Sequence, residues 1–441
     1  MSFNDECIDV VTPANAVLSA KYMRSFAYIT LKDRLPVTIT KVIDHLVRDK
    51  EQILSKFGEI AREELKEIIG SFSKLKNELQ TNKPFQLLSS DRKDVCLWNA
   101  YYQKETEKAG EEPRWYRTSW LYSECYMYRR MQESFEQSVS MKTFDPFRKQ
   151  KREALLSALS SVVILGEHVL KQLRLKTSSS LEIKNELLRL VKVNLWGNQH
   201  DLSLPVESLC SEDPIKNIDR MQDSILVDDS ECIWTTLMSP NRESDIVDFV
   251  NDNAGYELFT DFCLADALCT FTCIQKVRFH VKALPWFVSD TTEYDFHWVL
   301  RILRELSDKS SSLAELATRW EEYLHSGRWI VEVEDFWTLP HVYHEMKDVD
   351  PNLYTKLSEA ALVIFKGDLN YRKLLGETNW LPAESFATAL QGFHPAPLVT
   401  LRTVKADLIC GLKPGLAECL SEKLPDWMVS GKYAVIQFHG L

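Results

Sequence analysis

The chain has 441 residues, with 53 Lys plus Arg against 64 Asp plus Glu, so its net charge is −11. An acidic chain repels a phosphate backbone, which argues against a dedicated nucleic-acid-binding protein. Hydrophobic residues (45%) and charged residues (27%) occur at the levels of a globular protein and exclude a disordered chain. No run approaches the roughly 18 apolar residues of a membrane span, so no membrane partner is expected.

The first 20 residues carry Asp5, Glu6 and Asp9 but no Lys or Arg, unlike a secretory signal, which opens with positive charge. The ten cysteines form no CxxC pair, so reduced and buried thiols are expected in place of a disulfide framework. These features predict a protein of the cytoplasm, and they fit the nucleus equally well.

Residues 1–198 are predicted to form a helical N-terminal domain. Apolar residues recur at helical spacing over residues 39–47, 155–173 and 187–195. Gly197 follows the last of these runs and is expected to end a helix in the left-handed conformation. The polar stretch 199–244 is predicted to be a loop-like connecting segment.

Residues 245–441 show short apolar runs that alternate with helical stretches. The runs expected to be strands cover residues 246–250, 277–283, 361–365, 398–401 and 433–438. Such alternation is typical of an α/β domain, with a mainly parallel sheet covered by helices on both faces.

Four of these predicted strands are followed by polar clusters. The clusters are Asp252 with Asn253, Asp290, Asp368 to Arg372, and Arg402 to Lys405. Ligands of open α/β sheets bind beyond the carboxyl ends of the strands. Carboxylate and amide oxygens suit Mg²⁺ or Mn²⁺, and Lys and Arg can hold a phosphate group. Together the clusters predict a metal-assisted phosphoryl site.

Each cluster also has a simpler structural explanation. Asp290, with Glu293 three residues later, fits a helix N-cap with a capping box. Residues 252–255 and 367–370 have the composition of turns. Lys405 fits a solvated surface lysine, and Arg372 with Lys373 fits an exposed cationic pair. The sequence contains neither GxGxxG nor GxxxxGK[ST], so no common nucleotide-binding loop is visible.

Residues 252–257, 285–292 and 365–373 resemble the metal-dependent damage-control phosphatases, formerly domain of unknown function family 89. Residues 402–405 fit the RTxK signature of the third, sugar-phosphate subfamily. Residues 195–198, 201–203 and 394–397 fit as well. The resemblance extends from Ser25 over nearly the whole chain.

The resemblance implies a helical N-terminal domain packed on a Rossmann-like α/β catalytic domain, with the active site between them. It implies that Asp252, Asn253 and Asp290 are catalytic residues and bind Mn²⁺, Ni²⁺, Co²⁺ or Mg²⁺. The substrate-binding residues that it implies are Asp252, Asn253, Asp368, Leu369, Asn370, Tyr371, Arg372 and Lys405, with Asn198 and Arg402 in supporting positions.

The implied activity is hydrolysis of sugar phosphates such as fructose 1-phosphate and fructose 6-phosphate. The alternative is an S-adenosylmethionine-dependent protein-glutamate O-methyltransferase, for which the resemblance implies cofactor contacts at Glu257 and Asp290. A glycine-rich turn lets the backbone approach a nucleoside closely. The sequence has no such turn, and this favours the phosphatase. A non-catalytic binding protein is a third hypothesis, and the presence of all three metal-ligand candidates argues against it.

Overall fold

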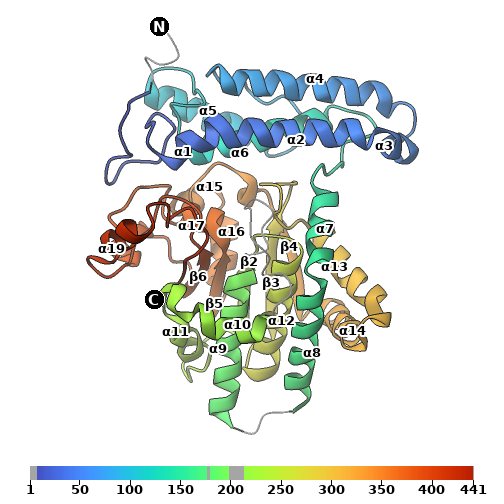
Figure 1. Cartoon of the computed structure of the whole chain (residues 1–441), viewed down its shortest axis with the longest axis vertical. Helices are drawn as coiled ribbons and strands as arrows, with labels where there is room; N and C mark the ends of the chain where they lie inside the picture. Colours follow the sequence, from blue (N-terminus) through green and yellow to red (C-terminus); the bar gives the residue numbers. More distant parts are fainter. Residues whose placement is uncertain (1–6, 176–178, 198–212, 441) are drawn as a thin grey trace.

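A computed structural model describes residues 7–175, 179–197 and 213–440. A layer of helices lies across one end of an α/β unit (Figure 1). The helices of this layer are α1 (Phe26–Ile29), α2 (Leu35–Arg48), α3 (Lys50–Phe57), α4 (Ala61–Gln80), α5 (Val95–Ala109) and α6 (Trp120–Glu136).

A π-helical turn, Thr30–Arg34, joins α1 to α2. Pro36 occupies the second position of α2 and has no N–H, so the carbonyl of Lys32 receives no α-helical hydrogen bond from it. The regular ladder is therefore interrupted within the wider turn.

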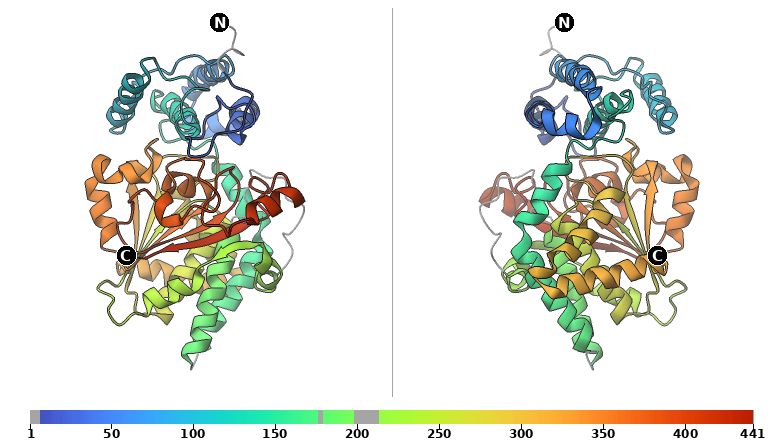
Figure 2. Two further views of the ribbon diagram at one scale, coloured as in Figure 1. Left: turned by 90° about the vertical axis from the view of Figure 1, so that its left-hand side faces the viewer. Right: turned by 90° about the vertical axis from the view of Figure 1, so that its right-hand side faces the viewer.

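Helices also surround the sheet of the α/β unit on both faces (Figure 2). They are α7 (Arg148–Ser157), α8 (Leu159–Leu175), α9 (Ser180–Trp196), α10 (Pro214–Met221), α11 (Ser230–Leu237), α12 (Tyr256–Phe271), α13 (Glu293–Glu305), α14 (Ser311–His325), α15 (Met346–Val349), α16 (Pro351–Ser358), α17 (Gly367–Leu374), α18 (Phe386–Ala389) and α19 (Leu416–Lys423).

The sheet has the strand order β1-β7-β6-β5-β2-β3-β4. Its strands pair in parallel except for β6 with β7, which are antiparallel. The strands are β1 (Ile225–Asp228), β2 (Ile246–Val250), β3 (Lys276–Lys282), β4 (Trp329–Glu334), β5 (Leu362–Lys366), β6 (Leu398–Thr403) and β7 (Ala434–His439). The predicted α/β class with a mainly parallel sheet is confirmed.

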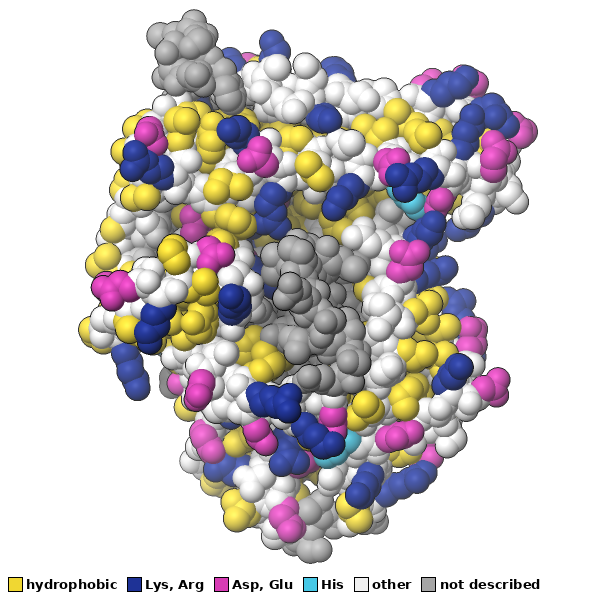
Figure 3. All heavy atoms as spheres, viewed as in Figure 1, with side chains coloured by type: hydrophobic (Ala, Val, Ile, Leu, Met, Phe, Trp, Pro, Cys, Tyr) yellow, Lys and Arg dark blue, Asp and Glu magenta, His cyan; other side chains and the backbone are white. Residues whose placement is uncertain are grey.

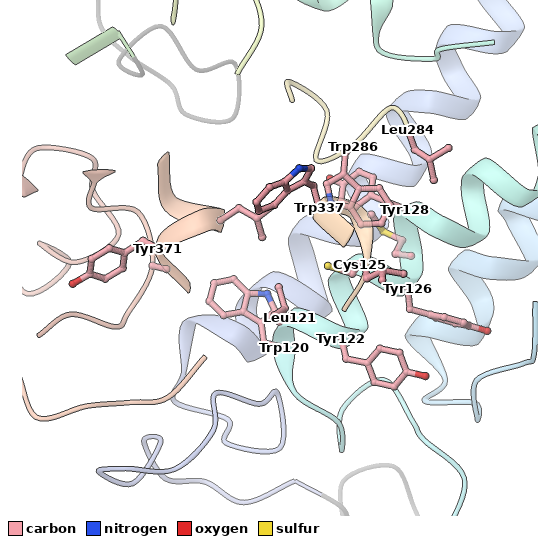
Figure 4. Packing of buried hydrophobic residues seen from close by; sticks show 14 of the residues in the cluster. Trp120, Leu121, Tyr122, Cys125, Tyr126, Tyr128, Leu284, Trp286, Trp337 and Tyr371 are labelled. Carbon is pink, nitrogen blue, oxygen red and sulfur yellow. The ribbon is translucent and has the colours of Figure 1, made fainter. Parts of the chain in front are cut away.

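Two apolar clusters hold the molecule together. One lies on the face of the sheet covered by α8, α9 and α12 to α14. The other runs from the helical layer onto the opposite face of the sheet, and in Figure 4 the aromatic side chains of α6 lie together with Trp286 and Trp337 of the α/β unit. The helical layer is therefore joined to the α/β unit by a continuous core.

Two local expectations are wrong. The segment 213–244 is not loop-like, because it contains α10, α11 and the edge strand β1. Gly197 is right-handed (φ −54°), and its small size is explained by packing, since a Cβ there would lie 2.7 Å from Oγ1 of Thr260 on α12. The division into domains at residues 198 and 245 stays a prediction. Helices α8 and α9, which belong to the predicted helical domain, pack against α12 of the α/β unit.

In the described ranges, no single helix has the length and apolar character needed to cross a membrane. The pair α7 and α8 passes that test only when the two are joined across a bend of 63°.

Candidate active site

The four predicted polar clusters follow β2, β3, β5 and β6, which lie next to one another in the sheet. From β2 the chain continues outward through β3 to β4, whereas β5 begins the series that runs the other way through β6. The boundary between β2 and β5 is thus a switch point in strand order, the usual place of a ligand site in such sheets.

Backbone pairing brings Asp252 and Asn253 to Asp290. The Thr291 N–H donates to the Asp252 carbonyl at 2.7 Å, and the Ala254 N–H donates to the Ser289 carbonyl at 2.8 Å. The three predicted metal ligands are buried and line one cavity. Asp290 is not a helix cap, because Thr292 caps α13 and forms the capping box with Asp295.

Hydrogen bonds fix the orientation of the Asn253 amide. Its Nδ2 donates to Asp252 Oδ2 at 3.0 Å and to Glu257 Oε2 at 2.8 Å. Its Oδ1 accepts from the Ser289 hydroxyl at 2.5 Å. The Lys282 ammonium lies 3.3 Å from Asp290 Oδ2 and balances the charge of that buried carboxylate.

Gly367 allows the β5 end to approach β2. Its φ is +80°, and a Cβ at this position would lie 1.8 Å from Asp252 Oδ2. The glycine is therefore required both by its backbone conformation and by the space that the Asp252 carboxylate occupies.

Asp368 and Lys405 line the cavity, and Arg402 holds Asp368 from behind. The buried Arg402 donates to Asp368 Oδ1 at 2.7 Å and to the carbonyls of Leu408 and Ala406 at 2.8 and 3.1 Å. The Lys405 N–H also donates to Asp368 Oδ1, at 3.3 Å. Arg402 thus occupies a supporting position, and Lys405 is half-buried at the cavity.

Arg372 lines the same cavity, and its guanidinium is bound by two carboxylates. It donates to Glu124 of α6 at 2.7 Å and to Glu377 at 2.8 and 3.0 Å. It also stacks 3.6 Å from the centroid of the Trp120 ring. Burial alone would lower the pKa of Arg372, but Glu377 and Glu124 raise it.

The explanation of Arg372 and Lys373 as an exposed pair is wrong, since both are buried. Lys373 donates to the carbonyls of Trp337 and Leu339 at 3.3 and 2.7 Å. Burial lowers the pKa of Lys373 to about 8.

Other predicted substrate residues differ in their placement. Leu369 lines the cavity. The Asn370 amide donates to the carbonyls of Val250 and Lys366, and the Tyr371 hydroxyl donates to Gln437 at 2.8 Å. Both side chains thus stabilise the segments that carry the site, and neither is among the residues that line the cavity. Asn198 lies outside the described residues.

Glu257, predicted as an S-adenosylmethionine contact, lies behind Asn253. Its Oε1 accepts from the Lys366 ammonium at 2.9 Å, and its Oε2 accepts from Asn253. Burial alone would lower the pKa of Lys366, but Asp261 and Glu257 raise it to about 12. Glu257 is therefore part of a buried ionic network that supports Asn253.

The cavity has a volume of about 150 Å³ and opens between the helical layer and the α/β unit. Its wall on the helical side was not predicted as part of the site. That wall consists of Phe26, Thr30, Arg34, Leu35, Thr38, Trp120, Glu124 and Tyr128.

The wall contributed by the 283–292 loop carries backbone strain. Phe287 and Val288 line the cavity with φ of +42° and +71°, which is unusual for non-glycine residues and especially for a β-branched valine. Such strain concentrates at functional sites. The loop also packs against the helical layer, since the Phe287 ring stacks on Tyr128 with centroids 4.9 Å apart.

The donor set fits a hard divalent cation. Asp252, Asn253 and Asp290 offer oxygens only, as Mg²⁺ and Mn²⁺ prefer. Over residues 7–175, 179–197 and 213–440, no group of three or more His, Cys, Asp or Glu side chains is arranged to hold a metal. The candidate ligands are therefore two carboxylates and one amide. Solvent or substrate oxygens would supply the other ligands of the cation.

The chain matches known proteins over most of its length. The family described as "Damage-control phosphatase ARMT1-like domain" matches residues 30–420. The chain is 44% identical to "Damage-control phosphatase ARMT1" of Xenopus tropicalis, covering 95% of this chain and 98% of that protein. It is 40% identical to the protein of the same name from Homo sapiens, covering 98% and 99%.

A crystal structure of a DUF89 family protein from Pyrococcus horikoshii covers 79% of this chain and 91% of that one. Its sequence identity is 15% and its TM-score is 0.40, so the evidence for kinship comes from the sequence matches. On those matches, the chain belongs to the ARMT1-like family of damage-control phosphatases.

Proposed function

We propose that this chain is a metal-dependent phosphatase that hydrolyses sugar phosphates such as fructose 1-phosphate and fructose 6-phosphate. Its family is one of phosphatases. The observation that carries the proposal is one cavity at the β2/β5 switch point, lined by Asp252, Asn253 and Asp290 and also by Arg372 and Lys405.

Asp252, Asn253 and Asp290 would hold Mn²⁺, Co²⁺, Ni²⁺ or Mg²⁺. A divalent cation supplies Lewis acidity, which polarises a phosphoryl oxygen and lowers the pKa of water. Lys282 stays beside Asp290 and Glu257 stays beside Asn253, so these neighbours keep both side chains oriented.

Lys405 and Arg372 place positive charge where the phosphate oxygens gain negative charge. Asp252 and Asp290 are committed to buried contacts in the site, so we propose that water, and neither carboxylate, attacks phosphorus. The aromatic wall of Phe26, Trp120 and Tyr128 limits the access of bulk water to this chemistry.

Removal of divalent ions tests the proposal. A chelator should abolish phosphate release from fructose 1-phosphate, and Mn²⁺, Co²⁺ or Ni²⁺ should restore it. Asp252→Asn should lower kcat by more than about 100-fold, because it removes charge from the cation site. The exposed Asp308→Asn is the matched control and should keep full activity, because Asp308 lines neither the cavity nor the groove beside it. Turnover that persists in the presence of chelator would contradict the metal mechanism.

S-adenosylmethionine provides the competing measurement. We expect no micromolar binding by calorimetry, because Glu257 is engaged by Lys366 and Asn253. Micromolar binding together with methyl transfer to protein glutamates would favour the methyltransferase alternative.

A further inference from the structure

A larger groove borders the small cavity. The groove has a volume of about 700 Å³ and lies between α2 and α7. It shares Arg34, Thr38 and Val288 with the small cavity, so these three residues border both spaces. Typical small-molecule pockets have volumes of about 300–1,000 Å³. At about 150 Å³, the small cavity is suited to the reacting phosphate, and the neighbouring groove offers room for the rest of a substrate.

Thr30 lies in the wall of the small cavity and is only 1% exposed. Its Oγ1 makes no hydrogen bond within the described part of the chain. A buried hydroxyl without a partner loses the hydrogen bonds that it makes to water in the unfolded chain. The hydroxyl is itself buried, so a rotation of the side chain is needed to bring it to a ligand oxygen in the cavity.

Arg34 lies one helical turn further, where the cavity and the groove border each other. In the described ranges it forms no ion pair, and its guanidinium rests 5.1 Å from the centroid of the Phe26 ring. Other cations around the cavity are paired differently: Arg372 with Glu124 and Glu377, and Arg402 with Asp368. Arg34 therefore offers its N–H donors to the cavity and the groove.

Both residues belong to the π-helical turn Thr30–Arg34. π-Helical turns are rare and frequently occur at functional sites. A chain of ring contacts supports this turn, because Phe26 packs against Trp120 with centroids 5.7 Å apart, and Trp120 stacks on Arg372. The turn is thus held next to the predicted phosphate-binding side of the cavity.

We propose that Thr30 and Arg34 bind the non-phosphate, hydroxyl-rich part of the substrate and so determine the specificity of the site for sugar phosphates. The proposal rests on the proposed phosphatase function. The Thr30 hydroxyl and the Arg34 guanidinium bond sugar oxygens, while Asp252, Asn253 and Asp290 act at the phosphate end. The helical layer in this view selects the substrate, and the α/β unit performs the chemistry.

The test compares a sugar phosphate with a phosphate ester that lacks hydroxyl groups. Hydrolysis of fructose 1-phosphate and of phenyl phosphate is to be measured in the presence of Mn²⁺. The proteins to be compared are the wild type, Arg34→Gln, Arg34→Lys and Thr30→Val. Arg34→Gln should lower kcat/KM for fructose 1-phosphate at least tenfold, mostly through KM, and change phenyl phosphate hydrolysis by less than threefold. Arg34→Lys should recover part of the loss.

Thr30→Val separates recognition from folding. It should raise KM for fructose 1-phosphate several-fold, yet leave the melting temperature unchanged or higher, because it removes a hydroxyl that has no partner. Lys32→Gln is the matched control, since Lys32 is exposed on the same turn and lines neither cavity. Equal losses on both substrates, or no loss on either, would overturn the proposal.

A failure of the phosphatase function is distinguishable from a failure of this inference. Should the wild-type protein with Mn²⁺ hydrolyse neither compound, the proposed function is wrong, and binding of fructose 1-phosphate is then measured by calorimetry. Weaker binding by Arg34→Gln than by Lys32→Gln would still support the assignment of Thr30 and Arg34. Identical binding, or none to the wild-type protein, would overturn it.

Discussion

The two walls of the cavity are built on different physical principles. On the α/β wall, charged side chains are held by buried opposite charges, as in Arg402 with Asp368 and Lys282 with Asp290. On the helical wall, three aromatic residues line the cavity beside Arg34 and Thr30, and the Thr30 hydroxyl has no hydrogen-bond partner in the described part of the chain. The difference indicates that the α/β wall is preorganised for charge, and it agrees with the proposal that polar groups of the helical wall bind the substrate.

Mixed charge also describes the outer surface. In Figure 3, Lys and Arg side chains are interspersed with Asp and Glu over the face shown. The chain has a net charge of −11. The cavity is mixed as well, because Arg34, Arg372 and Lys405 line it together with Glu124, Asp252, Asp290 and Asp368.

The largest expected effect concerns Arg372, which joins the two walls. Arg372→Ala should lower the free energy of unfolding by about 3–5 kcal/mol, because it leaves Glu124 and Glu377 buried without their cation. Denaturant titration measures this change. Arg372→Lys keeps the charge and should lose less. If Arg372→Ala keeps its stability but has a reduced kcat/KM, Arg372 only binds substrate. It would then not join the two walls of the cavity.

Gly367→Ala tests whether close packing on the α/β wall sets the position of Asp252. The added Cβ meets Asp252 Oδ2, so the carboxylate must move, and a displacement of about 1 Å is expected to lower kcat/KM on the order of 100-fold. Gly415→Ala is the matched control: its φ is +83°, but no atom lies within 4 Å of the new Cβ. Both variants should lose similar stability from backbone strain. Equal activities would show that Gly367 has only a conformational role.

Two buried histidines should make stability depend on pH in opposite directions. Burial alone would lower the pKa of His280 on β3, but Asp248 and Glu334 raise it to about 9. Its contribution is complete below about pH 6.5 and is lost as pH rises through 9.

Burial lowers the pKa of His341 to about 4, where its ring packs on Tyr101 of the helical layer. The unfolded chain then binds a proton before the folded one, so stability falls as pH decreases from about 6.5 to 4. His341→Phe should flatten the acid side of the stability profile, and His280→Gln the alkaline side. Melting temperatures between pH 4 and 9 measure both, and unchanged profiles would refute the assignment.

Lys405→Met should have the smallest effect. Loss of one charged hydrogen bond to the phosphate, worth about 1.5 kcal/mol, should reduce kcat/KM roughly tenfold. Metal affinity should stay the same, since Lys405 is assigned to the phosphate. An unaltered kcat/KM would return Lys405 to the role of a surface lysine.

Much of the α/β unit could be predicted from local patterns. Strand β2 was expected at residues 246–250 and occurs there, and the polar clusters after β2, β3, β5 and β6 meet at one edge as expected. Edge strands β1 and β4 were missed. In β4, Trp329–Glu334, charged residues alternate with apolar ones, which gives a weaker signal than a continuous apolar run.

The helical wall had no local signal. Thr30 and Arg34 lie on a turn whose composition is ordinary, and Glu124 looks like any acidic residue of an amphipathic helix. Only the resemblance extending from Ser25 pointed to that region. The structure places all three residues at the cavity, next to segments more than 200 residues away in the sequence.

The sequence by itself determined the class of fold, the strands that carry the chemistry and the oxygen donors at their ends, because these follow from hydrophobic periodicity and from the rule that parallel strands present their carboxyl ends together. Tertiary structure alone decided the partner of each charged group. Arg372 and Glu124 are 248 positions apart, and their pairing depends on how the helical layer docks. A buried charge takes its properties from whatever surrounds it, and those surroundings come from distant parts of the chain.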